Sequence, residues 1–341
     1  MRARTHRKRP DLSVVRFGWA GGIGEHSKGH ASARLANELA FTMWTLAYSM
    51  ANHGASLATQ SVHHPQATAR ASETLQMAAS ILAYLVDRVL PECEGAVTPT
   101  SAPSSSKGKA RAAAAMPELT AEAAAGVRLL LIAEAQHVET YGRARDGKTA
   151  PAFVAALYFS AFMQYDYAES TLKRIPGVYD KVVLGTLRVF VQTMAQVCLA
   201  MTYAHVGRDV MATDRRAGMQ LFREAHETAR VPFRALRARV VKGRRKDCDL
   251  NVIRLYKYIS AEFITIRRLV EAHAGSTNEL GVPRARSGEL DRFLPEPVDV
   301  TTSRRFEPPR PGFTVAPETD DVTYAALDDE IPEVPPLHRA P

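Results

Sequence analysis

The sequence predicts an all-α protein, and three observations carry this prediction. In residues 181–207 and 252–275 the apolar side chains recur at alternating steps of four and three residues, which places them along one face of a helix. No segment shows the strict alternation of apolar and polar residues that predicts a β-strand. Hydrophobic residues make up 46% of the 341 residues, which is enough to bury a sizeable core.

Further segments have helical patterns of their own. Residues 31–53 carry apolar side chains on two sides, which predicts a helix packed inside a layer. Residues 65–90 carry one apolar stripe and are followed by Pro91, which ends the run. Pro232 is expected to break or kink the chain. The remaining predicted helices are 118–141, 151–173 and 213–230.

One apolar run raises the question of a membrane span. It extends from Val189 to Gly207 and carries no charged side chain, but it includes Gln192, Gln196 and His205. Because polar side chains are costly at the centre of a bilayer, the run is interpreted as a buried helix.

Composition divides the chain into parts. Residues 1–13 form a basic arm, and residues 14–295 form the helical domain. Inside this domain, residues 95–117 are rich in Pro, Ser, Gly and Ala, which predicts a flexible insertion that cannot bury enough apolar surface to order itself. Residues 296–341 are rich in Pro and acidic side chains, which predicts a disordered tail that other protein modules bind.

One stretch matches the residue pattern of a nucleotide-binding motif. Gly142 to Thr149 match the phosphate-loop pattern G-x-x-x-x-G-K-[ST]. The pattern requires a strand immediately before its first glycine, and the preceding residues 127–138 instead have a helical stripe. Residues 142–150 are therefore predicted to form a turn between two helices, with a nucleotide-binding protein using Lys148 and Thr149 as an alternative.

Candidate metal and catalytic residues are few. Glu134 and His137 form an E-x-x-H pair on a predicted helix, but the second such pair that a di-iron site uses is absent. The pair is therefore expected to lie on the surface or to line a groove. The three cysteines lie far apart and form no C-x-x-C pair. No metal, no cofactor and no enzymatic activity are expected.

Basic residues crowd one part of the sequence. The net charge is +8, and the run "RVPFRALRARVVKGRRKD" at 230–247 carries eight Arg or Lys residues. A solvated helix face is the simplest explanation, and binding to an anionic membrane surface is the next. Nucleic acid is not expected, because no nucleic-acid-binding module accompanies the run. The candidate basic patch is Arg234, Arg237, Arg239, Lys242, Arg244, Arg245 and Lys246.

Several stretches together resemble the Bro-one domain family of endosomal-sorting scaffolds, of the Alix and Brox type. "VVRFGWAGGIGEHSKGHAS" resembles the family's F-x-W segment, and "LANELAFTMWTLAYSMANHG" and "ASETLQMAASILAYLVDRVLP" are similar to the two helices that follow. "LLLIAEAQHVETYGRARDGKTAPAFVAALYFSAFMQYDYAES" resembles a later pair of helices with a short charged turn. The resemblance spans residues 14–295, in the same order as in the family.

The resemblance implies a curved, boomerang-shaped solenoid with a tetratricopeptide-like core and no catalytic activity. It also implies a groove that binds an amphipathic helix at the C-terminus of an ESCRT-III subunit. By position, the groove falls at Glu139 and Tyr141 on one helix and at Phe153 and Leu157 on the next. Glu139 stands where the family has an aromatic residue.

The functional hypothesis is therefore a scaffold in multivesicular-body sorting, located in the cytoplasm and associated with endosomes. Its groove binds a partner helix, and its Pro-rich tail binds other modules. A basic helical adaptor on anionic membranes remains the alternative.

Overall fold

The computed structural model divides the chain into two units, Met1–Phe306 and Glu307–Pro341. The first unit extends eleven residues beyond the predicted domain boundary at residue 295. The basic arm 1–13, residues 94–116 and the tail beyond Phe306 lie outside the described residues. The structure describes residues 17–19, 30–32, 35–61, 64, 66–93, 117–175, 183–243, 260, 263–268, 270–272, 289–299 and 306.

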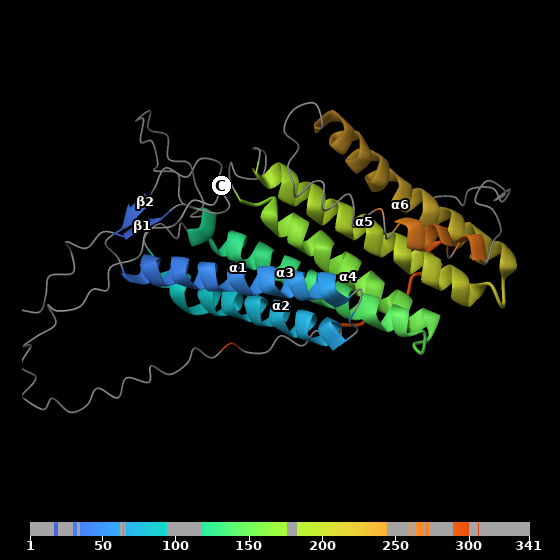
Figure 1. The fold of residues 1–341 in the computed structure, drawn as a ribbon, viewed down its shortest axis with the longest axis horizontal. Coiled ribbons are helices and arrows are strands. Elements are labelled where there is room, and N and C mark those ends of the chain that lie inside the picture. The colour runs from blue at the N-terminus through green and yellow to red at the C-terminus, as the bar shows by residue number, and fades with distance from the viewer. Residues whose placement is uncertain are drawn as a thin grey trace, which may run out of the picture. The chain divides into compact units, whose positions relative to one another are not determined.

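Long helices dominate this part of the chain, which confirms the all-α fold class (Figure 1). Each of them packs chiefly against its neighbours in sequence, in the manner of a helical solenoid. Shorter helical turns flank them at η2 (Leu85–Val89), η3 (Leu90–Glu92), η4 (Pro117–Leu119) and η6 (Asp291–Phe293). The long helices are α1 (Leu35–Ser61), α2 (Gln66–Tyr84), α3 (Ala121–Asp146), α4 (Pro151–Leu172), α5 (Val183–Val210) and α6 (Arg215–Gly243).

A small sheet precedes the helices, and the sequence did not predict it. Strand β1 (Phe17–Trp19) pairs antiparallel with β2 (His30–Ser32), with Gly18 opposite Ala31. Each strand has only three residues, which is too short for an alternating pattern to be recognised. The helix expected from residue 31 accordingly begins at Leu35 instead.

Helix α1 is buried on one side only, among the residues that the structure describes. Trp44 and Met43 lie in the core, whereas Leu39 and Leu46 are 48% and 45% exposed. The expectation of a helix packed on two sides is therefore wrong for this part of the chain. As the first helix of the series, α1 packs mainly against α2 and makes only a small contact with α3.

Helix α6 continues through Pro232, where the sequence predicted a break. A proline removes one backbone hydrogen bond from a helix and strains the turn before it. Packing of the side chains around the proline offsets this cost: Leu236 is fully buried, and the Phe233 ring stacks on Phe263 with centroids 4.7 Å apart. Phe263 belongs to the helical residues 263–268, inside the predicted helix 252–275.

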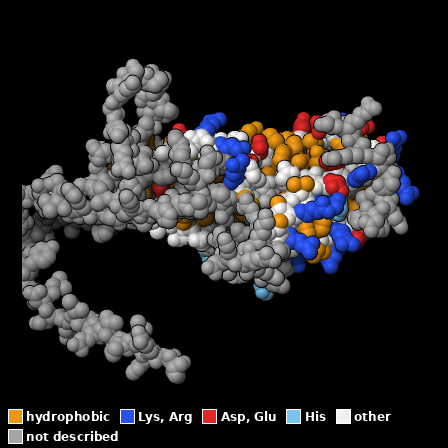
Figure 2. All heavy atoms as spheres, turned by 90° about the horizontal axis from the view of Figure 1, so that it is seen from above, with side chains coloured by type: hydrophobic (Ala, Val, Ile, Leu, Met, Phe, Trp, Pro, Cys, Tyr) orange, Lys and Arg blue, Asp and Glu red, His pale blue; other side chains and the backbone are white. Residues whose placement is uncertain are grey.

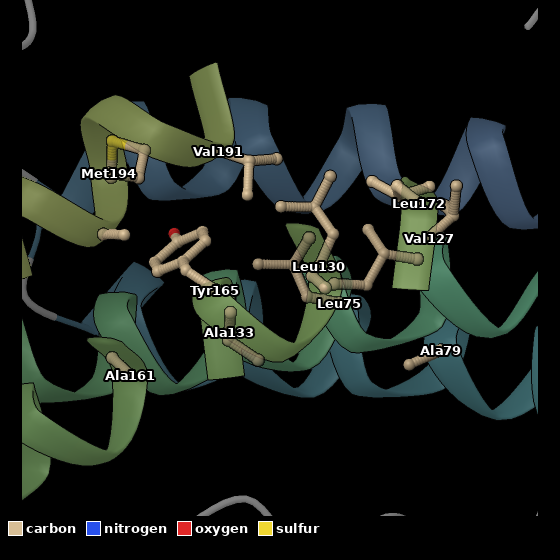
Figure 3. Close-up of a cluster of buried hydrophobic side chains, with 14 of the residues drawn as sticks. Leu75, Ala79, Val127, Leu130, Ala133, Ala161, Tyr165, Leu172, Val191 and Met194 are labelled. Atoms are coloured by element: carbon tan, nitrogen blue, oxygen red, sulfur yellow. The ribbon is translucent and has the colours of Figure 1, made fainter. Parts of the chain in front are cut away.

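The core runs between successive helices. In Figure 3, Leu75 of α2 approaches Val127 and Leu130 of α3, while Tyr165 of α4 lies among side chains of α3 and α5. Helix α5 is long and apolar enough to cross a membrane by composition alone at Leu187–Val210, but 72% of that window is buried within the protein. The interpretation of this run as a buried helix is confirmed.

We expect the buried side of α2 to contribute far more stability than the exposed side of α1. Leu82 is fully buried and Leu46 is 45% exposed. Leu82→Ala should lower the free energy of unfolding by about 3 kcal/mol, because it leaves a cavity in the core. Leu46→Ala, the matched control, should change it by less than about 1 kcal/mol. Urea denaturation followed by circular dichroism measures both, and equal effects would contradict this packing.

Candidate partner-binding face

The turn between α3 and α4 is formed by residues 147–150. Gly147 ends α3 in the left-handed conformation, with φ of 68°, which glycine adopts without strain. Pro151 occupies the first turn of α4, where its missing N–H costs nothing. The predicted turn between two helices is thus confirmed, but it begins at Gly147, five residues later than predicted, because α3 continues to Asp146.

The same geometry excludes a phosphate loop. Gly142 lies inside α3, which continues to Asp146, so its backbone belongs to a helix and not to an open loop. A side chain at Gly142 would place its Cβ 2.6 Å from Cγ2 of Thr68. The glycine therefore permits the close approach of α3 to α2. Lys148 is exposed and lies 3.7 Å from the carboxylate of Asp146.

The structure separates the residues that were predicted to form one groove. Phe153 is 39% exposed at the start of α4, but Leu157 is fully buried. The expectation that Leu157 lines an open groove is therefore wrong. It lies where α4 faces α3, and its backbone carbonyl accepts a hydrogen bond from Nε2 of Gln136 at 3.3 Å.

Glu139 and Tyr141 do not share a surface. Residues two apart in a helix point in nearly opposite directions. Glu139 forms an ion pair with Arg143 at 3.0 Å on the same helix, and Tyr141 is partly buried on the other side. Among the four predicted groove residues, Phe153 is the exposed apolar side chain.

A segment near the end of the domain crosses the helices, and we call residues 289–299 the strap. Leu290 packs with Ala155 of α4, Val206 of α5 and Leu221 of α6. Further along, the carbonyl of Val298 accepts a hydrogen bond from Gln136 of α3 at 3.0 Å. The strap thus passes from the α5–α6 side of the array to the α3–α4 pair.

The far end of the strap is held by Asp299. Its carboxylate accepts hydrogen bonds from the Ser160 hydroxyl and from Nε2 of Gln164 at 2.7 Å. Beyond it, the ring of Phe306 lies edge-on to Tyr84 of α2, with centroids 5.7 Å apart. These contacts explain why the first unit ends at Phe306. The Pro-rich composition predicted disorder from residue 296. Composition does not reveal the contacts with other helices that hold Val298, Asp299 and Phe306.

The strap crosses one side of α4, which we call the α4 face: Phe153, Ser160, Gln164 and Tyr167. Their spacings of seven, four and three residues place them along one line of the helix. Leu157 lies on the same line but is fully buried, as Ser160 nearly is, so the line is open to solvent mainly at its two ends. Asp299 occupies the middle of this line, at Ser160 and Gln164. The two aromatic side chains on either side of it stay open, with Phe153 39% and Tyr167 54% exposed.

Glu134 and His137 were expected at a surface or groove, and that expectation is wrong for His137. His137 is 2% exposed, and its ring lies 5.9 Å from that of Tyr158, which in turn stacks on His205 at 5.7 Å. Glu134 accepts a hydrogen bond from the Tyr165 hydroxyl. This buried polar cluster joins α3, α4 and α5. Among the described residues, no group of three His, Cys, Asp or Glu side chains is placed to hold a metal ion.

Burial controls the ionisation of this cluster. It lowers the pKa of His137 to about 4 and, together with nearby Arg208, that of His205 to about 4. Burial raises the pKa of Glu134 to about 7, although the hydrogen bond from Tyr165 opposes the rise. Both histidines are therefore neutral at neutral pH, and the pKa of Glu134 falls in the physiological range.

The predicted basic patch is only partly described. Arg234 and Arg237 are exposed on α6. The side chains of Arg239 and Lys242, and the whole of Arg244, Arg245 and Lys246, lie outside the described residues.

Comparison with known proteins finds solved structures that are similar to this chain. No family model matches the chain, and no curated protein matches it. A complex of the ALIX BRO1 domain with CHMP4C is similar at 15% identity, with 86% of this chain and 73% of that chain covered and a TM-score of 0.49. ALIX in complex with the SIVmac239 PYKEVTEDL late domain is similar at 15% identity, with 86% and 38% covered and a TM-score of 0.48.

We expect Glu134 to make stability depend on pH. Because its pKa is about 7 in the folded protein, compared with an ordinary value of 4.5, its contribution is greatest below about pH 4.5 and is lost as the pH rises through 7. Glu134→Gln keeps an oxygen for Tyr165 and cannot ionise. The variant should match the wild type near pH 4 and be more stable near pH 8, by up to about 3 kcal/mol.

Thermal unfolding at several pH values measures this difference. The contributions of His137 and His205 are common to both proteins and cancel in the comparison. The exposed Glu92, changed to Gln, is the control, and its effect on stability should be much smaller than that of Glu134→Gln. A Glu134→Gln effect of the same size at every pH would contradict the assignment.

Asp299 is expected to hold the strap. Asp299→Ala removes the acceptor for Ser160 and Gln164, so amide hydrogen exchange in residues 289–299 should increase while exchange in α3 and α4 changes little. Asp166→Ala is the control, because Asp166 is an exposed residue of α4. Unchanged exchange in the strap would show that Asp299 does not anchor it.

Proposed function

We propose that the protein is a non-enzymatic helical scaffold that binds an amphipathic helix of a partner protein on the α4 face. The observation that carries the proposal is Phe153, a large aromatic side chain that is 39% exposed beside the α3–α4 turn. Aromatic side chains contribute strongly to protein interfaces because they bury much apolar surface and lose little conformational freedom.

The surroundings of Phe153 suit a bound helix. Arg143, in the last turn of α3 before the α3–α4 turn, is paired with Glu139, so this end of α3 presents little net charge to a partner. The start of α4 supplies the small exposed side chain of Ala152 next to Phe153. An apolar anchor with a polar rim is the usual composition of a surface that receives the apolar side of an amphipathic helix.

The partner in this proposal is the C-terminal helix of an ESCRT-III subunit, which the sequence resemblance to the Bro-one family implies. The ALIX BRO1 domain in the similar structure is in complex with CHMP4C. The scaffold would then act in the cytoplasm at endosomes, and modules that read Pro-rich sequences would bind the segment from Glu307 onward.

The strap determines how much of the α4 face a partner can use. A helix confined to the Phe153 end leaves Asp299 in place. A helix that extends from Phe153 to Tyr167 covers 15 residues of α4, about 21 Å from first to last, and has to displace Asp299 from Ser160 and Gln164. The two binding modes therefore differ in their response to Asp299→Ala: the first is unaffected, and the second becomes tighter.

Substitution of Phe153 tests the proposal. Phe153→Asp places a charge at the centre of the interface without disturbing the core, because the side chain is already in contact with solvent. Its affinity for a fluorescent peptide of an ESCRT-III C-terminal helix should fall by at least 30-fold, about 2 kcal/mol. Fluorescence anisotropy measures the dissociation constant.

Leu46→Asp is the matched control, since Leu46 is an equally exposed apolar residue on α1. It should bind the peptide as the wild type does. Equal binding by the wild type and Phe153→Asp would remove the α4 face from the proposal. Absence of binding by the wild type would refute an ESCRT-III helix as the partner.

A further inference from the structure

Helix α6 carries a row of arginines at a constant spacing. Arg216, Arg223, Arg230 and Arg237 follow one another at intervals of seven residues. Seven residues complete almost two turns of an α-helix, so the row drifts by only about 20° per step and stays on one side of α6. Arg234 lies within one turn of Arg230 and Arg237. We call these five residues the arginine stripe, which extends over about 30 Å of helix.

The stripe lies away from the buried side of the helix. Ala225, Ala229 and Leu236 are on the buried side, at or below 1% exposure, while Arg216, Arg234 and Arg237 are exposed. Figure 2 views the molecule from the side on which α6 lies in Figure 1, and Lys and Arg side chains gather there with hydrophobic ones between them.

A neighbouring helical segment extends the positive surface. Phe263 stacks on Phe233 of α6 and also contacts the ring of His226 at 5.5 Å. This packing brings Arg267 close to the stripe. In addition to burial, the charges of Arg230, Arg234 and Arg267 all lower the pKa of His226. Arg268 is exposed on the same segment.

Acidic side chains offset only part of this charge. Glu227 pairs with Arg230 at 3.2 Å, and Glu271 pairs with Arg267 at 2.7 Å. Within the described part of the chain, no ion pair forms to Arg216, Arg234, Arg237 or Arg268. The surface is therefore left with an excess of positive charge that fits an anionic partner.

Exposed aliphatic side chains accompany the arginines. Val231 is 68% exposed and lies next to Arg230 on α6. Ile264 is 48% exposed and lies one helical turn before Arg267. Both expose apolar surface to water within a basic region. Binding of phosphates alone does not require these two apolar side chains.

We propose that the arginine stripe, with Arg267, Arg268, Val231 and Ile264, is a docking surface for an anionic membrane. Arginines bind lipid phosphates, and Val231 and Ile264 enter the boundary between headgroups and acyl chains. A nucleic acid satisfies the charges, but its backbone offers no apolar layer for the two aliphatic side chains. This surface is separate from the α4 face, so either can fail without the other.

Vesicle sedimentation with the full chain tests the proposal. The wild type should bind vesicles of phosphatidylcholine with about 30% phosphatidylserine and should not bind vesicles of phosphatidylcholine alone. Binding should weaken as sodium chloride rises from about 0.1 M to 0.5 M, because salt screens exposed charges. The stripe variant changes Arg216, Arg234 and Arg237 to Gln. Each basic residue near such a surface contributes about fivefold, so the variant should bind on the order of a hundredfold more weakly.

The control variant removes the same charge elsewhere. Arg70, Arg88 and Arg174 are exposed on α2, η2 and the end of α4, and their change to Gln should leave vesicle binding nearly unchanged. Equal losses in the two triple variants would show that net charge alone attracts the protein, and would overturn the docking surface.

Val231→Ser separates a membrane from a nucleic acid. It should weaken vesicle binding severalfold and leave the binding of a fluorescent DNA duplex unchanged. If the wild type binds the duplex through the stripe and does not bind anionic vesicles, the membrane proposal is wrong. Circular dichroism confirms that each variant keeps the helical content of the wild type.

Discussion

The rest of the structure depends on one constraint: each long helix buries its apolar side mainly against the helices that adjoin it in the chain. α3 fits closely on α2 because Gly142 leaves room for Thr68, and a Cβ at Gly126 would lie 2.6 Å from Leu172 of α4. Helices in the middle of the series are covered on two sides, and α1 keeps Leu39 and Leu46 exposed. Because contacts are local along such an array, the surfaces of different helices remain available for different partners.

The strap adds the non-local contacts that this array lacks. It joins α6, α5, α4 and α3 through Leu290, Val298 and Asp299. The Asp299 carboxylate thereby separates the two exposed aromatic side chains of the α4 face, Phe153 and Tyr167. The proposed binding of a partner helix therefore depends on a segment more than a hundred residues away in sequence from α4, since Asp299 follows Ser160 by 139 positions.

Charge is distributed in opposite ways in the interior and on the surface. Inside, Glu134, His137 and His205 lie where burial disfavours their charged forms, so they are held close to neutrality. Outside, α6 places its arginines at a spacing of seven residues, where water solvates them and where their fields add along the helix. The proposed helix-binding and membrane-binding surfaces use these two properties separately: apolar area at Phe153, and charge with aliphatic side chains on α6.

The sequence by itself determined the helices, because a periodicity of three and four residues and the capping residues act locally. Pro151 begins α4, Asp214 accepts a hydrogen bond from Ala217 at the start of α6, and a turn separates α3 from α4 as predicted, although it begins at Gly147 and not at Gly142. The tertiary structure alone decided that Leu157 and His137 are buried, that α6 passes through Pro232, and that Val298 and Asp299 are ordered. Each of these depends on contacts with another helix, and no pattern within the segment itself encodes them.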